Sequence, residues 1–204
     1  GFVAANPHEW LAHPGTVGRA IVGELKICDQ DNPDLELPQG ETGQVFFANG
    51  PEFTYHNDPK KTAESRNKHG WTTLGDIGYL TDDGFLHLTD RKAFMIISGG
   101  VNIYPQEIED RLITHPEVMD AAVIGVPDKD FGEAVKGVVQ LKNHAHAGDA
   151  MAEKLIKWCR EELSAIKTPK SIDFEEELPR HANGKLYKRL LKDRYWGKTD
   201  SRII

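Results

Sequence analysis

Cysteine is scarce in this chain of 204 residues, which contains only Cys28 and Cys159. The two lie far apart in the sequence and lack the short spacing that zinc ligands show. A disulfide framework belongs to an oxidising compartment and needs more cysteines than these, so a reducing compartment is the simplest interpretation. We therefore expect the protein in the cytoplasm.

Clusters of positive charge and long apolar runs are also missing. The chain has 25 Lys and Arg against 32 Asp and Glu, a net charge of −7, and no basic block. Binding to a phosphate backbone needs clustered cations, so we expect no nucleic-acid partner. No apolar run approaches the length of a membrane span, and no secretory signal opens the chain, so no integral membrane segment is predicted.

The nine histidines form no group with metal-ligand spacing. His144 and His146 lie close together in a loop-like segment before Gly148. A zinc site needs three or four converging ligands, and these two histidines fall short of that number. We interpret them as solvated loop residues, and no metal site is predicted.

Residues 85–109 form the segment around which the rest of the chain is organised. The run 94–97 is apolar, rich in aromatic and β-branched residues, and predicts a strand. Ser98, Gly99 and Gly100 follow it, and the two glycines supply the positive φ that a tight turn needs.

A helix is predicted directly after this turn. Pro105 suits its first position, because proline has no N–H to lose there. Glu107 and Glu109 are expected in the first turn, where carboxylates complement the helix dipole.

The two parts of the chain on either side of residue 90 differ in pattern. Residues 1–90 predict short strands joined by turns, and a short helix after Pro59. Residues 91–204 alternate helices and strands, so the fold class is α+β. The expected strands are 16–22, 24–29, 43–48, 118–126, 134–141 and 172–174, and the expected helices are 105–114, 151–163 and 186–195.

Five segments in this order resemble the motifs of the adenylate-forming ligases, the family of acyl-CoA synthetases, luciferases and non-ribosomal adenylation domains. The segments are residues 14–19 (PGTVGR), 40–44 (GETGQ), 71–76 (WTTLGD), 85–109 and 178–185 (LPRHANGK). The resemblance implies that a carboxylate attacks ATP, releasing pyrophosphate and forming an acyl-adenylate, and that a thiol then displaces AMP.

The resemblance also implies a domain organisation. Residues 1–90 correspond to the last, β-rich subdomain of the family's large domain, and residues 91–204 to its mobile C-terminal domain, with a hinge at 90–93. The family's Ser/Thr/Gly-rich phosphate loop is not found here. We therefore expect the C-terminal part of a longer enzyme, whose own N-terminal domain is a partner and binds most of the Mg²⁺ that accompanies ATP.

Four residues match family positions for adenylate formation. Asp76 matches the aspartate that receives both ribose hydroxyls, and Arg91 the arginine that touches the ribose; without the other motifs, both are ordinary loop residues. Leu88 falls where the family contacts the adenine edge, and a core role is equally compatible. Lys185 matches the catalytic lysine, the alternative being a surface lysine after an Asn-Gly turn.

Four further residues match positions near CoA. Gly99 and Gly100 are expected to line the pantetheine tunnel, where a side chain would block the thiol. Phe131 matches an aromatic that flanks CoA, with core packing as the alternative. Lys170 matches a basic residue that some relatives use on a CoA phosphate.

The sequence departs from the family at several of these motifs. Leu74 stands where a threonine usually precedes the ribose aspartate. Ala93 stands at the hinge pivot, with Lys92 one position earlier. Ile166 and Thr168 replace two family residues near Lys170.

Three functions are compatible with the resemblance. The first is an AMP-forming ligase that joins a fatty or aryl acid to CoA, which residues 90–109 favour. The second is an adenylation domain that loads a carrier protein. The third is a non-catalytic binding module, since the isolated chain is not expected to turn over without a phosphate loop. A homodimer is an additional partner hypothesis.

Overall fold

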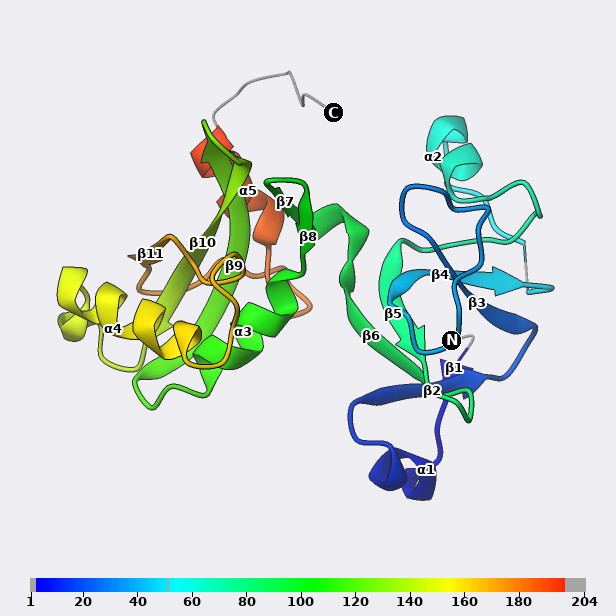
Figure 1. Ribbon diagram of the computed structural model, residues 1–204, viewed down its shortest axis with the longest axis horizontal. Coiled ribbons are helices and arrows are strands. Elements are labelled where there is room, and N and C mark those ends of the chain that lie inside the picture. Colours follow the sequence, from blue (N-terminus) through cyan, green and yellow to red (C-terminus); the bar gives the residue numbers. More distant parts are fainter. Residues whose placement is uncertain (1–2, 51, 197–204) are drawn as a thin grey trace. The chain divides into compact units, whose positions relative to one another are not determined.

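The computed structural model describes residues 3–50 and 52–196, which belong to two compact units (Figure 1). The first unit is Gly1–Ala93 and the second is Phe94–Ile204. Both combine strands with helices, which confirms the predicted α+β class. No helix among the described residues is long and apolar enough to cross a membrane.

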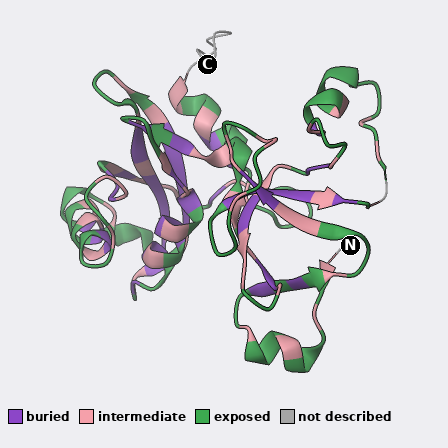
Figure 2. Cartoon of the chain, turned by 45° about the vertical axis from the view of Figure 1, so that its right-hand side comes forward, coloured by how far each residue is buried: buried purple, intermediate pink, exposed green. Residues whose placement is uncertain are grey.

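The first unit is a six-stranded antiparallel sheet in the order β1-β2-β6-β5-β4-β3. Ile27, Val45 and Leu86 form the centre of its core. Figure 2 shows burial concentrated on the strands, whereas the two short helices have no buried residue. The elements are β1 Val3–Ala4, α1 Pro7–Ala12, β2 Thr16–Ala20, β3 Glu24–Cys28, β4 Gly43–Ala48, α2 Pro59–Glu64, β5 Asp76–Leu80 and β6 Leu86–Arg91.

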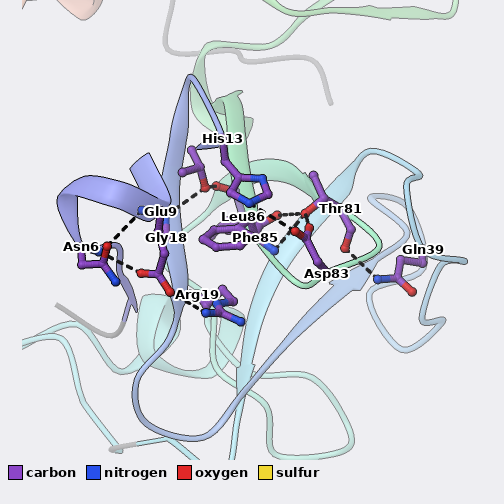
Figure 3. A network of polar contacts seen from close by, with 11 residues as sticks. Asn6, Glu9, His13, Gly18, Arg19, Gln39, Thr81, Asp83, Phe85 and Leu86 are labelled. Atoms are coloured by element: carbon purple, nitrogen blue, oxygen red, sulfur yellow. Dashed lines mark hydrogen bonds and ion pairs between the residues drawn. The ribbon is translucent and has the colours of Figure 1, made fainter. Parts of the chain in front are cut away.

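A network of polar and ring contacts fastens α1 to the sheet (Figure 3). The Asn6 side chain accepts the N–H of Glu9, whose carboxylate accepts the N–H of Asn6, a capping box that fixes the start of the helix. Glu9 also pairs with Arg19 of β2. The Arg19 guanidinium lies 4.6 Å from the centre of the Phe85 ring, against which His13 stacks at 3.8 Å.

The second unit is a five-stranded sheet in which β10 is the central strand. β10 pairs with β9 and β7 antiparallel and with β11 parallel, and β7 pairs with β8. The elements are β7 Ile96–Ser98, β8 Val101–Ile103, α3 Pro105–Ile113, β9 Val118–Asp128, β10 Gly132–Leu141, α4 Asp149–Arg160, β11 Ser171–Phe174 and α5 Lys188–Trp196. Two short 3-10 helices complete it, η1 Lys92–Phe94 at the unit boundary and η2 His144–His146.

Helices cover both faces of this sheet (Figure 1). Alternate residues of a strand point to opposite faces. Ala121 and Val123 of β9 belong to the core cluster that contains residues of α3 and α4. Their neighbours Ala122 and Ile124 belong to a second cluster with Leu191 of α5. The helix that follows Lys185 therefore packs on the face opposite α3 and α4.

Three local expectations need correction. Phe94 lies in η1, and the strand begins at Ile96, which pairs with Ile103. Glu109 is not a dipole-complementing residue of the first turn of α3; its carboxylate is buried and accepts the N–H of Val123 at 2.7 Å. The helix expected over 151–163 is α4, which begins and ends earlier.

His146 is not simply solvated, because its Nδ1 lies 2.8 Å from the carboxylate of Glu117. This contact is one hydrogen bond, and the His146 side chain remains exposed. Among residues 3–50 and 52–196, no group of three or more His, Cys, Asp or Glu side chains is arranged to hold a metal ion.

Candidate functional site: three clusters of predicted residues

Asp76 and Arg91 face each other on neighbouring strands of the first unit. Asp76 opens β5 and Arg91 ends β6, and the strand register places them directly opposite. Arg91 Nε lies 3.0 Å from Asp76 Oδ1. Because one ion pair leaves further lone pairs on the carboxylate and further N–H groups on the guanidinium, the pair can still bind hydroxyl groups.

The turn before Asp76 is held by Thr73, a residue that sequence analysis did not single out. Its hydroxyl donates to the carbonyl of Val45 at 2.7 Å and accepts the N–H of Gly75 at 3.0 Å. Gly75 has a φ of 80°, which glycine adopts without strain. Leu74 leaves no hydroxyl at the family position, and the buried Thr73 supplies one a residue earlier.

Lys92 joins the hydrogen bonds around this turn. Its ammonium donates to the carbonyl of Gln30 at 2.6 Å and to Gln44 Oε1 at 3.3 Å, and Gln44 Nε2 donates to the Thr73 hydroxyl at 3.2 Å. An open pocket of about 140 Å³ is lined by Gln44, Thr73 and Gly75, among others.

Leu88 lies on β6 opposite Gly78 and is 42% exposed. Leu88 is therefore not part of the core of the first unit. An exposed leucine one strand away from Asp76 is available to contact the apolar edge of a ligand.

Gly99 and Gly100 form the two-residue turn between β7 and β8. Their φ angles are 56° and 80°, and Ser98 pairs with Val101 across the turn. Positive φ at both central residues is the pattern of a type I′ hairpin, so the predicted tight turn is confirmed. A Cβ on Gly100 would meet nothing within 4 Å, whereas one on Gly99 would lie 2.9 Å from Phe131 Cδ1.

Phe131 and Lys170 lie beside this turn. Gly99 donates its N–H to the carbonyl of Phe131 at 2.9 Å. The Lys170 ammonium lies 4.1 Å from the centre of the Phe131 ring, within the range of a cation–π contact. Phe131 is 44% exposed, so it is not a core residue of the second unit, and part of its ring is open to solvent.

Asp128 organises this second cluster, and sequence analysis missed it. One carboxylate oxygen accepts the N–H groups of Asp130 and Phe131, both at 3.0 Å, and the other lies 3.0 Å from Lys170 Nζ. The hydrogen bond from Lys170 and these two backbone bonds lower the pKa of Asp128. A sequence signal for Asp128 does exist. An aspartate at the start of a turn commonly accepts the N–H groups of the residues two and three positions later.

Lys185 directly follows the turn of a small hairpin, and its carbonyl accepts the N–H of His181 at 2.8 Å. Arg180 and Leu186 form a β-bridge, Gly184 has a φ of 82°, and Asn183 Oδ1 accepts the N–H of Lys185 at 3.2 Å. Arg180 donates to the carbonyl of Gly184 at 2.6 Å and pairs with Asp120. The backbone of the hairpin is therefore fixed, while the Lys185 side chain is exposed.

The structure thus groups the predicted residues into three sets. Asp76 and Arg91 are in contact, and Gly99, Phe131 and Lys170 are in contact. The Lys185 hairpin makes its described hydrogen bonds and ion pairs within itself and with Asp120 of the same unit.

A domain family matches the part of the chain that contains Phe131, Lys170 and Lys185. Residues 107–185 match the AMP-binding enzyme C-terminal domain, a match that ends at Lys185. The match covers less than half of the chain. The resemblance to adenylate-forming ligases is confirmed.

Curated proteins that the chain resembles include CoA ligases. It is 40% identical over 204 residues to a long-chain-fatty-acid–CoA ligase of Salmonella typhimurium, covering 98% of the chain and 35% of the relative. It is 40% identical over 185 residues to a 2-succinylbenzoate–CoA ligase of Bacillus mycoides, covering 89% of the chain and 36% of the relative. The chain therefore spans about a third of the length of these relatives.

Solved structures agree in fold. ATP-bound MatB from Rhodopseudomonas palustris matches with a TM-score of 0.80 and 34% identity, over 89% of this chain and 36% of that one. An o-succinylbenzoate CoA synthetase from Bacillus subtilis, in complex with its acyl-adenylate intermediate, matches with a TM-score of 0.79 and 32% identity, over 97% of this chain and 40% of that one.

Proposed function

We propose that this chain is part of an AMP-forming ligase that joins a fatty or aryl carboxylic acid to CoA in the cytoplasm. Residues 1–90 supply the last subdomain of the large domain, and residues 91–204 the mobile C-terminal domain, with a hinge at 90–93. A carboxylate oxygen attacks the α-phosphorus of ATP and pyrophosphate leaves. The CoA sulfur then attacks the acyl carbon, the thiol proton is released, and AMP leaves.

The observation that carries the proposal is the cluster of Gly99, Phe131 and Lys170 in a chain whose relatives are CoA ligases. An open glycine turn leaves room for a thin chain such as pantetheine. An exposed ring with an ammonium beside it suits the adenine and the phosphates at the other end of CoA.

In the first step, Asp76 accepts the two ribose hydroxyls of ATP and Arg91 contacts the same ribose. Leu88 packs against the adenine edge. The Lys185 ammonium stabilises the negative charge that develops when the carboxylate attacks the α-phosphate. The family resemblance implies that the Mg²⁺ ion that accompanies ATP is bound mainly by the N-terminal part of the enzyme.

In the second step, Gly99 and Gly100 line the path of the thiol, and Phe131 and Lys170 hold the nucleotide end of CoA. Ala93 absorbs the dihedral change of the hinge, because a pivot needs conformational freedom and no particular side chain. A homodimer stays a prediction, which the sedimentation coefficient of the full-length enzyme checks.

The test is pyrophosphate release by the full-length enzyme with a panel of fatty and aryl acids. Three acceptors are compared: CoA, a pantetheinylated carrier protein and an amine. We expect release with at least one acid and thioester formation with CoA. Pyrophosphate release with transfer only to the carrier protein would favour the adenylation-domain alternative. No release with any acid would overturn the proposal.

A further inference from the structure

An ion pair is buried where helix α5 begins, three residues after Lys185. Lys188 Nζ lies 2.8 Å from Glu109 Oε1, and the two side chains are only 9% and 5% exposed. Both charges are thus removed from water, which is costly unless further contacts satisfy them.

These further contacts connect three parts of the second unit. Glu109 belongs to α3 and accepts the N–H of Val123 on β9. The Lys188 ammonium lies 5.3 Å from the centre of the ring of Phe94, the first residue of this unit. The helix that follows Lys185 is therefore fixed both to the core and to the end of the unit next to the expected hinge.

A second lysine of α5 makes a parallel connection one turn later. Lys192 Nζ lies 3.1 Å from Glu133 Oε1, and Glu133 Oε2 accepts the N–H of Ile97 at 3.0 Å. Ile97 belongs to β7, which leads into the Gly99–Gly100 turn. Residues four apart share one helix face, so one face of α5 carries both connections.

A buried ion pair is weak evidence for stability, because apolar residues of the same volume often serve as well or better. Its directional contacts nevertheless define a single position for α5. We infer that Lys188 and Glu109 are positioning residues, which hold the Lys185 hairpin in a fixed place relative to Phe94. The expected effect on pyrophosphate exchange rests on the proposed function, whereas the expected effect on the position of the hairpin does not.

The experiment compares three variants of the full-length enzyme with the wild type: Lys188→Met, Lys188→Arg and the exposed control Arg189→Met, whose side chain is 71% exposed. Pyrophosphate exchange reports the first step, and CoA transfer from supplied acyl-adenylate reports the second. Amide hydrogen exchange at His181 and Gly184 reports the hairpin, with Val138 of β10 as the reference amide.

We expect Lys188→Met to slow pyrophosphate exchange at least tenfold more than CoA transfer. Amide exchange at His181 and Gly184 should accelerate by a larger factor than at Val138, whose exchange reports the loss of global stability. Lys188→Arg restores most of the loss, and Arg189→Met behaves as the wild type. Equal losses in both steps, or unchanged amide exchange in the hairpin, would overturn the inference.

The double variant Glu109→Gln/Lys188→Met covers the case in which Lys188→Met does not fold, because it leaves no unpaired buried charge. It is expected to fold and still to exchange its hairpin amides faster than the wild type; wild-type exchange rates would contradict the inference. If the wild type itself shows no pyrophosphate exchange, the proposed function fails, and amide exchange alone decides the positioning role.

Discussion

Two carboxylate–cation pairs, one in each unit, differ in what surrounds them. Asp76 and Arg91 lie at strand ends, and the Arg91 side chain is 58% exposed. Glu109 and Lys188 lie in the interior, with the Lys188 side chain 9% exposed. A ligand can reach the first pair and replace its solvent contacts, whereas the second pair only contacts other parts of the fold. The exposed pair is thus available to bind a ligand, whereas the buried pair has a structural role.

The largest effect on stability is expected when the buried pair is broken. Lys188→Met removes the cation that pairs with the buried Glu109 carboxylate, and we expect the free energy of unfolding to fall by about 3–5 kcal/mol. Arg91→Met removes a partner from an exposed pair and is expected to cost less than about 1 kcal/mol. Urea unfolding of both variants measures the two losses of unfolding free energy. Equal losses would contradict the distinction between a buried and an exposed pair.

Lys185→Ala tests an exposed cation that is expected to act in chemistry. Removing one electrostatic donor of this kind typically costs on the order of hundred-fold in rate. We expect that loss in pyrophosphate exchange, and near wild-type CoA transfer when acyl-adenylate is supplied. Full pyrophosphate exchange by the variant would mean that Lys185 is only the solvated tip of an Asn-Gly turn.

Gly100→Leu places bulk in the open space beside the β7–β8 turn. We expect pyrophosphate exchange to be spared and CoA transfer to fall about tenfold or more, corresponding to about 1.4 kcal/mol. Gly100→Ala is the matched control, since it carries the same strain at φ 80° without the bulk. If both variants lose both steps equally, Gly100 is needed for the turn and not for the thiol.

The smallest expected effect concerns Asp128 and Lys170. The pKa of Asp128 is lowered in the folded chain, so its contribution to stability is present above its unfolded pKa of about 3.8 and is lost as the pH falls through the lower, folded value. NMR titration should find its midpoint below 3.8, and Lys170→Met should raise that midpoint. An unchanged midpoint in the variant would indicate that the pair does not form in solution.

Features that depend on local chemistry could be predicted from the sequence. Pro105 predicted the start of α3, because proline fixes φ near its helical value. Gly99 and Gly100 predicted the turn after Ser98, because glycine readily adopts positive φ. The Asn-Gly step before Lys185 predicted its exposed position for the same reason.

Features that depend on distant partners could not be predicted. Glu109 looked like a first-turn carboxylate, but its partner Lys188 lies on another helix. Phe94 looked like a strand residue, but it lies in η1 against that same lysine. The contact between Asp76 and Arg91 requires the register of β5 on β6, which no local pattern contains.

The most direct test of the proposed reaction follows an isotope. The full-length enzyme is supplied with ATP, CoA and an acid labelled with ¹⁸O in both carboxylate oxygens. If the carboxylate attacks the α-phosphorus, one labelled oxygen leaves with AMP, and mass spectrometry should find AMP carrying a single ¹⁸O. Label in inorganic phosphate, with ADP as the nucleotide product, would contradict the account, because it would mean attack at the γ-phosphorus.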